Sequence, residues 1–293
     1  MSAALLFPGQ GSQFVGMARD VYDALPPARE VIRRADEVLG FKLSTLMFEG
    51  PEDELTATAN AQPAIFVASL AMLRCLDLPA DVAFAAGHSV GEYSALVAAA
   101  AMAFEDGLRL VQERGRLMHQ AGADTPGGML AVLGLDETGI AEACASVAPL
   151  LACAANYNAP GQIIVSGEEA GLTAVEAALR ARGAKRILRL NVSAAFHSPV
   201  MAAAAAHLRS AIDRVPIRAP KWPIVGNASA RPLSTEADIR QELAQQIAAP
   251  VRWEASIRTM LAAGATTFLE VGPGKVLTGL LKRIAPEVEI LSC

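Results

Sequence analysis

A single serine between two glycines is the clearest chemical signature of this chain. The stretch GHSVGEYSA, residues 87–95, has the form Gly-x-Ser-x-Gly and overlaps the end of an apolar run at 82–87. This pattern is typical of a sharp turn from a strand into a helix that exposes the serine hydroxyl. We therefore expect Ser89 to be a nucleophile, with the Val90 N–H placed to hold a developing oxyanion. An ordinary glycine-bounded turn is the alternative.

A serine nucleophile needs a base, and the four histidines are the candidates. His88 neighbours Ser89, so its side chain starts in another direction, and we expect it to support the turn. His119 and His207 fall inside predicted helices, where a structural role is expected. His197 lies in SAAFHSPVM, just before another predicted helix, where it can face a cleft and where the helix start disfavours its charged form. His197 is therefore the candidate base.

Two glycine-rich stretches could in principle bind phosphate. PGQGSQ (8–13) and VGPGKV (271–276) match neither G-x-x-x-x-G-K-[ST] nor G-x-G-x-x-G. We expect the first to supply a backbone N–H donor, as the second half of an oxyanion hole. The second is predicted to be a turn from a strand into a helix.

Arg114 stands in LVQERGRLM (110–118), on an otherwise apolar helix face. A surface salt bridge would be an unremarkable role for it. A buried arginine beside a cleft would instead require an anionic partner, and a carboxylate on the substrate would serve.

Alternating strands and helices would position these residues, because apolar runs of strand length alternate with runs of helical periodicity. The predicted strands of the main part are 3–7, 82–87 and 266–272, and the stretch PIVGN (223–227) belongs to the same part. Its predicted helices are one beginning near Phe14 and those at 27–39, 61–76, 91–102, 105–122, 236–248 and 275–284, with another after 196–198.

The pattern changes between the serine and His197. Strands are predicted at 127–135, 150–158, 161–167 and 184–192, and helices at 136–148 and 169–183. The order β-α-β-β-α-β is that of a ferredoxin-like unit. We therefore expect a small subdomain at 125–195, inserted in a large α/β domain formed by 1–124 and 196–293.

Composition excludes several classes of protein. The chain has 293 residues, 53% of them hydrophobic, which suits one large domain with an insert. Its net charge of −5 argues against nucleic-acid binding. The start of the chain lacks the basic region of a signal peptide, and the apolar runs are too short to span a membrane. Four scattered cysteines argue against a disulfide framework or a zinc site and fit a reducing, cytoplasmic compartment; they are Cys75, Cys144, Cys153 and Cys293.

Taken in order, the motifs resemble those of the malonyl-CoA:acyl carrier protein transacylases. The resemblance rests on FPGQGSQ (7–13), AQPAIF (61–66), GHSVGEYSAL (87–96), VQERGRLM (111–118), NYNAPGQIIVSG (156–167), FHSPVM (196–201), PVRW (250–253) and EVGPGKVLTGL (270–280). Each motif alone is weak, but the ordered set is specific and runs from end to end. It implies a large α/β-hydrolase-like domain with a ferredoxin-like insert.

The resemblance also implies roles for individual residues. Ser89 would be the acylated nucleophile and His197 the general base. Gln10 and the Val90 N–H would form the oxyanion hole. Arg114 would pair with the malonyl carboxylate, and the Gln246 main-chain carbonyl would orient the histidine. Ala249 stands where the family pattern often has asparagine.

The implied reaction is ping-pong transfer of malonyl from coenzyme A to Ser89, and then to the phosphopantetheine thiol of acyl carrier protein. Coenzyme A enters as a thioester substrate, the partner carries the phosphopantetheine, and no bound cofactor or metal is expected. The expected state is a monomer. His88 and Phe196 would join Arg114 at the substrate. In related polyketide acyltransferases a Phe before the histidine accompanies malonyl rather than methylmalonyl, although Phe196 could be plain core.

An acidic carrier protein would need a local basic surface on this acidic chain. The segment 180–189 is the first candidate, with Lys282 and Arg283 as the second and a merely solvated basic face as the alternative. The basic residues of the first candidate are Arg180, Arg182, Lys185, Arg186 and Arg189.

Other functions stay open at this point. A serine esterase or thioesterase would share the Ser89 turn, although the chain has no HGGG-type oxyanion loop. A non-catalytic carrier-protein docking module is disfavoured by the intact Ser89, His197 and Arg114. Within the family the context could be fatty-acid synthesis, which we favour as the commonest, a trans-acting polyketide acyltransferase, which SAAFHS also resembles, or the malonyl-loading subunit of malonate decarboxylase.

Overall fold

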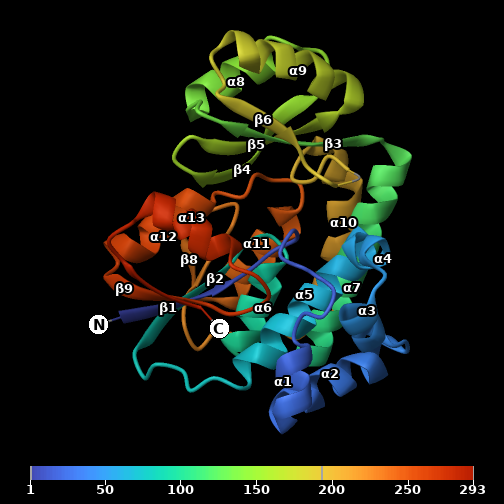
Figure 1. The fold of residues 1–293 in the computed structure, drawn as a ribbon, viewed down its shortest axis with the longest axis vertical. Helices are drawn as coiled ribbons and strands as arrows, with labels where there is room; N and C mark the ends of the chain where they lie inside the picture. The colour runs from blue at the N-terminus through green and yellow to red at the C-terminus, as the bar shows by residue number, and fades with distance from the viewer. Residues whose placement is uncertain (1, 193, 293) are drawn as a thin grey trace.

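The computed structural model describes residues 2–192 and 194–292, and it has two β-sheets with helices around them (Figure 1). Ser193, in the SAAFHS segment, and Cys293 lie outside the described residues. The larger sheet has six strands in the order β10-β9-β1-β2-β7-β8, and only β8 runs antiparallel to its neighbour. Its strands are β1 (Ser2–Phe7), β2 (Val82–Gly87), β7 (Ile224–Val225), β8 (Pro232–Leu233), β9 (Ala265–Glu270) and β10 (Glu289–Ser292).

The helices associated with this sheet come from both ends of the chain. They are α1 (Arg19–Ala24), α2 (Pro26–Leu39), α3 (Leu43–Glu49), α4 (Glu52–Thr56), α5 (Thr58–Leu73), α6 (Gly91–Ala98), α7 (Phe104–Asp124), α10 (Ala202–Ile212), α11 (Glu236–Gln246), α12 (Trp253–Ala262) and α13 (Val276–Ile284), with a 3₁₀ turn at Pro199–Met201.

Strand β1 has apolar side chains on both faces of the sheet, and helices cover both faces. Leu5 and Phe7 point into a large core shared with α2, α5 and α7, whereas Ala4 and Leu6 point into a second core shared with α12 and α13. Parallel strands buried on both faces are apolar throughout, as this one is. Helix α5 is buried on nearly all sides for the same reason, since it lies within the larger core.

The smaller sheet is formed by one continuous stretch of chain. Its strands are β3 (Gly127–Leu133), β4 (Ala152–Ala159), β5 (Gln162–Glu168) and β6 (Arg186–Arg189), in the antiparallel order β4-β5-β3-β6. Helices α8 (Glu137–Ala145) and α9 (Glu169–Ala181) cover one face, shown at the top of Figure 1. Alternate residues of β3 therefore divide: Leu130 and Val132 pack under these helices, and Met129 and Ala131 face the opposite way.

Backbone hydrogen bonds join the small sheet to the segment that follows α11. Asn156 of β4 forms an isolated parallel bridge with Val251, which follows α11. The Tyr157 N–H donates to the Val251 carbonyl and the Val251 N–H donates to the Ala155 carbonyl, each at 2.8 Å.

Most predicted elements are present within a few residues of their expected bounds, but the predicted helix near Phe14 is wrong. Residues 14–18 form turns, and α1 begins only at Arg19. The reason is local, because Gly16 has φ 96° and Ala18 has φ 60°, both in the left-handed region that ends a regular helix. Helices α3, α4 and α12 and strands β8 and β10 were not predicted. No helix in the described ranges is both long and apolar enough to cross a membrane.

Candidate active site

The turn after β2 requires both glycines that flank Ser89. A Cβ on Gly87 would lie 1.9 Å from the Gly91 carbonyl carbon, and a Cβ on Gly91 would lie 2.2 Å from the Phe7 carbonyl oxygen. Strand β1, strand β2 and helix α6 therefore meet more closely than any side chain would allow. Ser89 sits in the turn with φ 53°, and its side chain lies beyond the carboxyl edge of the sheet.

Ser89 and His197 form a hydrogen-bonded pair. Ser89 Oγ lies 2.8 Å from His197 Nε2, although 108 positions separate them in the chain. On the other side of the ring, Nδ1 lies 3.0 Å from the Gln246 carbonyl and 3.1 Å from that of Ala249. Because a carbonyl can only accept, Nδ1 carries the proton, and Nε2 is free to accept the serine proton.

The surroundings of His197 keep it neutral. It is buried, and burial together with the positive charge of Arg114 lowers its pKa to about 3. The main-chain acceptors on Nδ1 oppose this shift but do not cancel it. Burial also lowers the pKa of His88, whose Nε2 lies 2.9 Å from the Asn158 side-chain oxygen. Both imidazoles are therefore uncharged at neutral pH.

Arg114 is fully buried and lies beside the serine. Its guanidinium donates to Ser89 Oγ at 3.0 Å, to the Gln62 side chain at 2.6 Å and to the Gln246 side chain at 2.9 Å. These acceptors are all neutral, and no carboxylate of the described residues forms an ion pair with Arg114. Glu92 of α6 is near Arg114, but burial and the nearby Glu242 raise the pKa of Glu92 well above its ordinary value. The uncharged form of Glu92 is therefore favoured. A buried cation without a counter-ion is a site for an anionic group.

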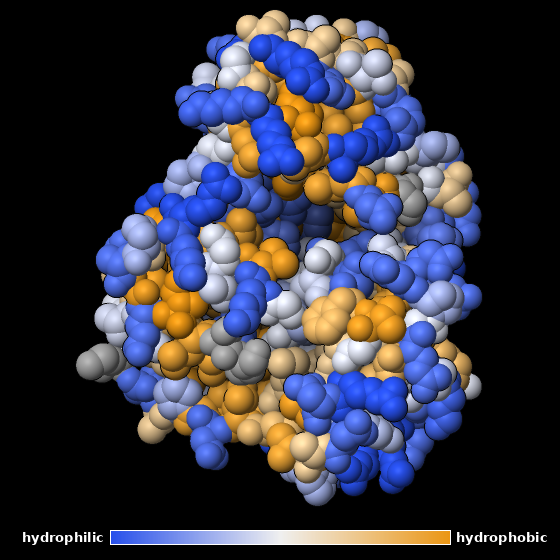
Figure 2. All heavy atoms as spheres, in the orientation of Figure 1, coloured by the Kyte–Doolittle hydropathy of each residue, from blue (hydrophilic) through white to orange (hydrophobic). Residues whose placement is uncertain are grey.

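A cavity of about 440 Å³ opens over the Ser89–His197 pair. The inner face of the small sheet roofs it through Met129, Ala131 and Ile164, and Phe196 and Met118 also line it. Figure 2 shows a hollow between the upper part of the molecule, which carries the small sheet, and the lower part. The reacting groups thus lie where the two sheets face each other.

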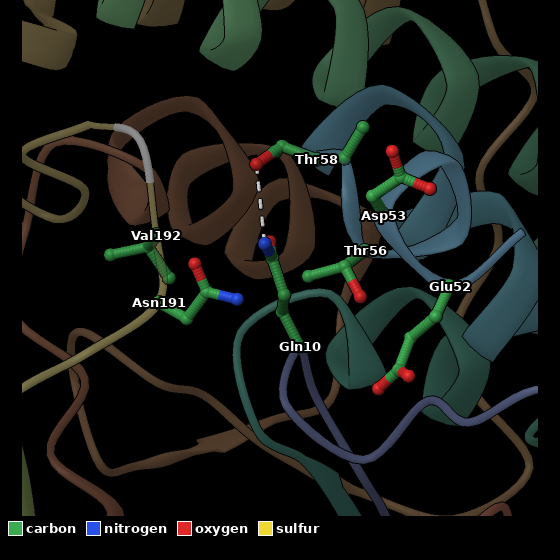
Figure 3. A pocket seen from close by; sticks show the side chains of 8 residues that line it. Gln10, Glu52, Asp53, Thr56, Thr58, Asn191 and Val192 are labelled. Atoms are coloured by element: carbon green, nitrogen blue, oxygen red, sulfur yellow. Dashed lines mark hydrogen bonds between the residues drawn. The ribbon is translucent and has the colours of Figure 1, made fainter.

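A second hollow of about 550 Å³ adjoins the first, since both are lined by Gln10, Asn191 and Val192. In Figure 3 the Gln10 side chain stands between Asn191 and the side chains at the end of α4 and the start of α5. Its amide nitrogen donates to Thr58 Oγ1 at 3.2 Å. The Gln10 side-chain amide is thus bound to Thr58, and the main-chain N–H of Gln10 is the group that could serve an oxyanion.

The predicted basic segment lies at the edge of the small sheet, on the end of α9 and on β6. Arg180 pairs with Glu176 at 2.6 Å, Arg182 approaches Glu142 at 3.8 Å, and Arg189 pairs with Glu169. Lys185 and Arg186 have no acidic partner among the described residues. The positive charge of this segment is therefore smaller than the sequence suggests.

The sequence analysis did not predict the roles of several residues at the site. Gln62 holds Arg114, Asn158 contacts His88, and the Asn227 side chain accepts the Ser89 N–H at 2.6 Å. The available signal was an amide within an otherwise apolar stretch, as in AQPAIFVASL for Gln62. Such a signal indicates a buried polar contact but not its partner.

Comparisons with known proteins show the family to which the chain belongs. The family model described as "Acyl transferase domain" matches residues 4–289. The malonyl CoA-acyl carrier protein transacylase of Bacillus subtilis is 44% identical over 96% of this chain and 90% of its own length, and that of Escherichia coli is 41% identical over 96% and 92%. Among solved structures, a malonyl-transacylase in complex with a type II polyketide-synthase acyl carrier protein has a TM-score of 0.97 at 38% identity, covering 100% of this chain and 96% of that one. The chain therefore belongs to the acyl transferase family, together with the malonyl CoA-acyl carrier protein transacylases.

Proposed function

We propose that this protein transfers malonyl from coenzyme A to the phosphopantetheine thiol of an acyl carrier protein, through a malonyl-Ser89 intermediate. The observation that carries the proposal is Arg114, a buried cation with no acidic partner among the described residues, 3.0 Å from the nucleophile. A malonyl group offers a carboxylate for the guanidinium and a thioester carbonyl for the serine. Similar proteins of Bacillus subtilis and Escherichia coli are named for this reaction, and their similarity to this chain supports the same substrate.

In the first half-reaction His197 Nε2 takes the Ser89 proton as Oγ attacks the thioester carbonyl. The main-chain N–H groups of Val90 and Gln10 hold the oxyanion. The carbon–sulfur bond then breaks, and the coenzyme A sulfur leaves with the proton from His197. The Gln246 carbonyl holds the imidazole in the required tautomer, so no Asp or Glu is needed as a third member.

The second half-reaction runs through the same groups. The pantetheine thiol of the carrier protein gives its proton to His197 and attacks the serine ester, and the proton returns to Ser89 Oγ. Pairing with Arg114 fixes the acyl group throughout, and the roofed cavity limits access of water to the ester. No bound cofactor enters this scheme, because both acyl donor and acceptor bring their own thiol.

The finer assignments belong to the same proposal. The large sheet with its helices would be an α/β-hydrolase-like domain of 1–124 and 196–293, and 125–195 a ferredoxin-like insert. The strand order β4-β5-β3-β6 supports the second description. We place the protein in the cytoplasm, as a monomer in fatty-acid synthesis. The free thiols of Cys75, Cys144 and Cys153 fit a reducing compartment.

Mass spectrometry after mixing with malonyl-CoA tests the proposal. Without carrier protein, the peptide that contains Ser89 should gain one malonyl group, and S89A should gain none. Adding carrier protein with its pantetheine arm should remove the label from Ser89 and place it on the carrier. Carrier protein without the arm is the matched control and should remove none. Release of free malonate in place of transfer would identify a serine esterase.

A further inference from the structure

The side chain of Asn227 holds the backbone of the nucleophile turn at two points. Asn227 follows β7, whose Ile224 is paired with Ala85 of β2, so both strands end at the same edge of the sheet. Its Oδ1 accepts the Ser89 N–H at 2.6 Å, and its Nδ2 donates to the Gly87 carbonyl at 2.7 Å. One amide thus fixes the two peptide groups that flank His88 and lead into Ser89.

Asn227 is itself held at both of its backbone groups. Its N–H donates to Glu92 Oε2 at 2.9 Å, and its carbonyl accepts from the Arg252 N–H at 2.8 Å. Asn227 and Glu92 are both buried, with 1% and 0% of their surfaces exposed. Glu92 belongs to α6, the helix that starts at Gly91, two residues after Ser89. The contacts Ser89–Asn227–Glu92 therefore close a ring around the start of that helix.

Such a clamp meets a need of the turn. Ser89 has φ 53°, in the left-handed region that is unfavourable for a residue with a Cβ. The hydrogen bonds to Asn227 are made with the turn in this conformation and therefore stabilise it. They also occupy the Ser89 N–H, so it does not compete for the oxyanion. The next N–H along the chain, that of Val90, is left to face the reacting carbonyl.

We infer that Asn227 is a positioning residue for the reaction, which sets the direction of Ser89 Oγ and of the Val90 N–H, and that Glu92 holds Asn227 in place. The inference rests on the proposed function in that Ser89 is taken as the nucleophile. It concerns the rate of attack by Ser89 and not the recognition of malonyl.

The test separates the rate of attack from the fraction of folded enzyme. N227A loses both contacts to the turn. N227D is nearly isosteric and keeps an acceptor for the Ser89 N–H, but it places an oxygen against the Gly87 carbonyl. Rapid-quench reaction with labelled malonyl-CoA gives an amplitude, which counts active sites, and a rate constant for each site. For both variants we expect an amplitude close to that of the unaltered protein and a rate constant at least tenfold lower.

A matched control comes from the same part of the fold. Ser256 is buried and donates to the Gly226 carbonyl at 3.1 Å, next to Asn227, but it does not touch the turn. S256A should lower the unfolding temperature and leave the rate constant for each site unchanged. A reduced amplitude with an unchanged rate constant in N227D would show a purely structural role and overturn the inference.

A second probe distinguishes this inference from the proposed function. A small alkyl fluorophosphonate forms a P–O bond with an aligned serine as fluoride leaves, and it needs no malonyl recognition. We expect N227D to slow this modification of Ser89 as well. If malonyl-CoA failed to acylate the unaltered protein, the proposed function would be wrong, yet slower phosphonylation of N227D would still support the inference. Equal phosphonylation rates would contradict it.

Discussion

Arg114 donates a hydrogen bond to Ser89 Oγ, the same oxygen that lies 2.8 Å from His197 Nε2. The nucleophile therefore stands between its base and a buried cation. The cation orients the hydroxyl before substrate arrives, and its charge also helps to keep the base unprotonated. Under the proposed function, recognition of an acidic acyl group and activation of the serine would both depend on this one side chain.

Replacing this cation should change the choice of acyl group. We expect R114A to lower kcat/KM for malonyl-CoA by roughly 100-fold or more, because loss of a buried charged partner costs about 3 kcal/mol or more. Acetyl-CoA has no carboxylate, so its kcat/KM should fall far less. R114K is the matched control, since it keeps the charge but loses the forked geometry of the guanidinium. Its kcat/KM for malonyl-CoA should lie between those of R114A and the unaltered protein. A malonyl-to-acetyl ratio unchanged in R114A would refute the assigned role.

The low pKa of His197 should be visible in the pH dependence of acylation. The base acts when neutral, and burial and Arg114 lower its pKa to about 3. The rate of Ser89 modification by an uncharged fluorophosphonate should therefore stay flat from pH 7.5 down to pH 5. An ordinary histidine would instead cause a fall around pH 6.5. In R114A the removed charge no longer opposes protonation, so the rate should begin to fall at a higher pH. A midpoint near 6.5 in the unaltered protein would contradict the prediction.

The same shift makes stability depend on pH. The folded-state pKa of His197 lies below its unfolded value of about 6.5, so between these values the unfolded chain binds more protons. This contribution to the free energy of unfolding is fully present above pH 6.5 and is lost as pH falls towards 3. By pH 5 the loss is about 2 kcal/mol. Urea unfolding should show this drop, and H197Q should lack that part of it. Parallel curves for the two proteins would exclude the effect.

Phe196 should restrict the group at the α-carbon of the acyl chain. It directly precedes His197, lines the cavity and is only 5% exposed. We expect its ring to fill space that an α-methyl group would need. We expect malonyl-CoA to be preferred over methylmalonyl-CoA, and F196S to reduce that preference several-fold in competition assays. F196L keeps an apolar side chain of similar reach and should change it less. Equal rates for the two thioesters in the unaltered protein would rule out this role.

Docking of the carrier protein should depend on the unpaired cations of the 180–189 segment. Lys185 and Arg186 have no acidic partner in the described part of the chain, so reversing either charge breaks no ion pair there. We expect R186E to raise the KM for carrier protein several-fold, with little change in acylation by malonyl-CoA. R209E makes the same charge change at an exposed position on α10 and should have no effect. If R186E left this KM unchanged, docking would have to involve another surface, of which Lys282 and Arg283 are the next candidate.

The features predicted most accurately from the sequence are those that depend on neighbouring residues in the chain. The Ser89 turn needs glycine at both flanks because three backbones meet there, and that requirement leaves a readable pattern. The strands and helices of the insert are likewise recognisable from their own periodicity. The wrong prediction of a helix near Phe14 shows where local reading fails. Two residues there have left-handed backbone conformations that interrupt a helix, and no proline signals the interruption.

Contacts between distant segments left little trace in the sequence. Gln62 and Arg114 are 52 positions apart, and Ser89 and Asn227 are 138 apart. Strand β7, which delivers Asn227, has only two residues, too few to show any alternation. A polar amide in an apolar stretch indicates that a hydrogen-bond partner exists, but only the folded structure shows which residue that partner is.

The bridge between Val251 and β4 ties the roof of the cavity to the segment that carries the histidine's acceptors. Gln246 and Ala249 present their carbonyls to His197, and two residues after Ala249 both the N–H and the carbonyl of Val251 are hydrogen-bonded to β4. We expect a tilt of that sheet, such as a bulkier acyl group would require, to shift the two carbonyls that hold the imidazole. Under the proposed function, we expect an oversized acyl chain to react slowly even when it binds, because making room for it would disturb the proton transfer that consumes it.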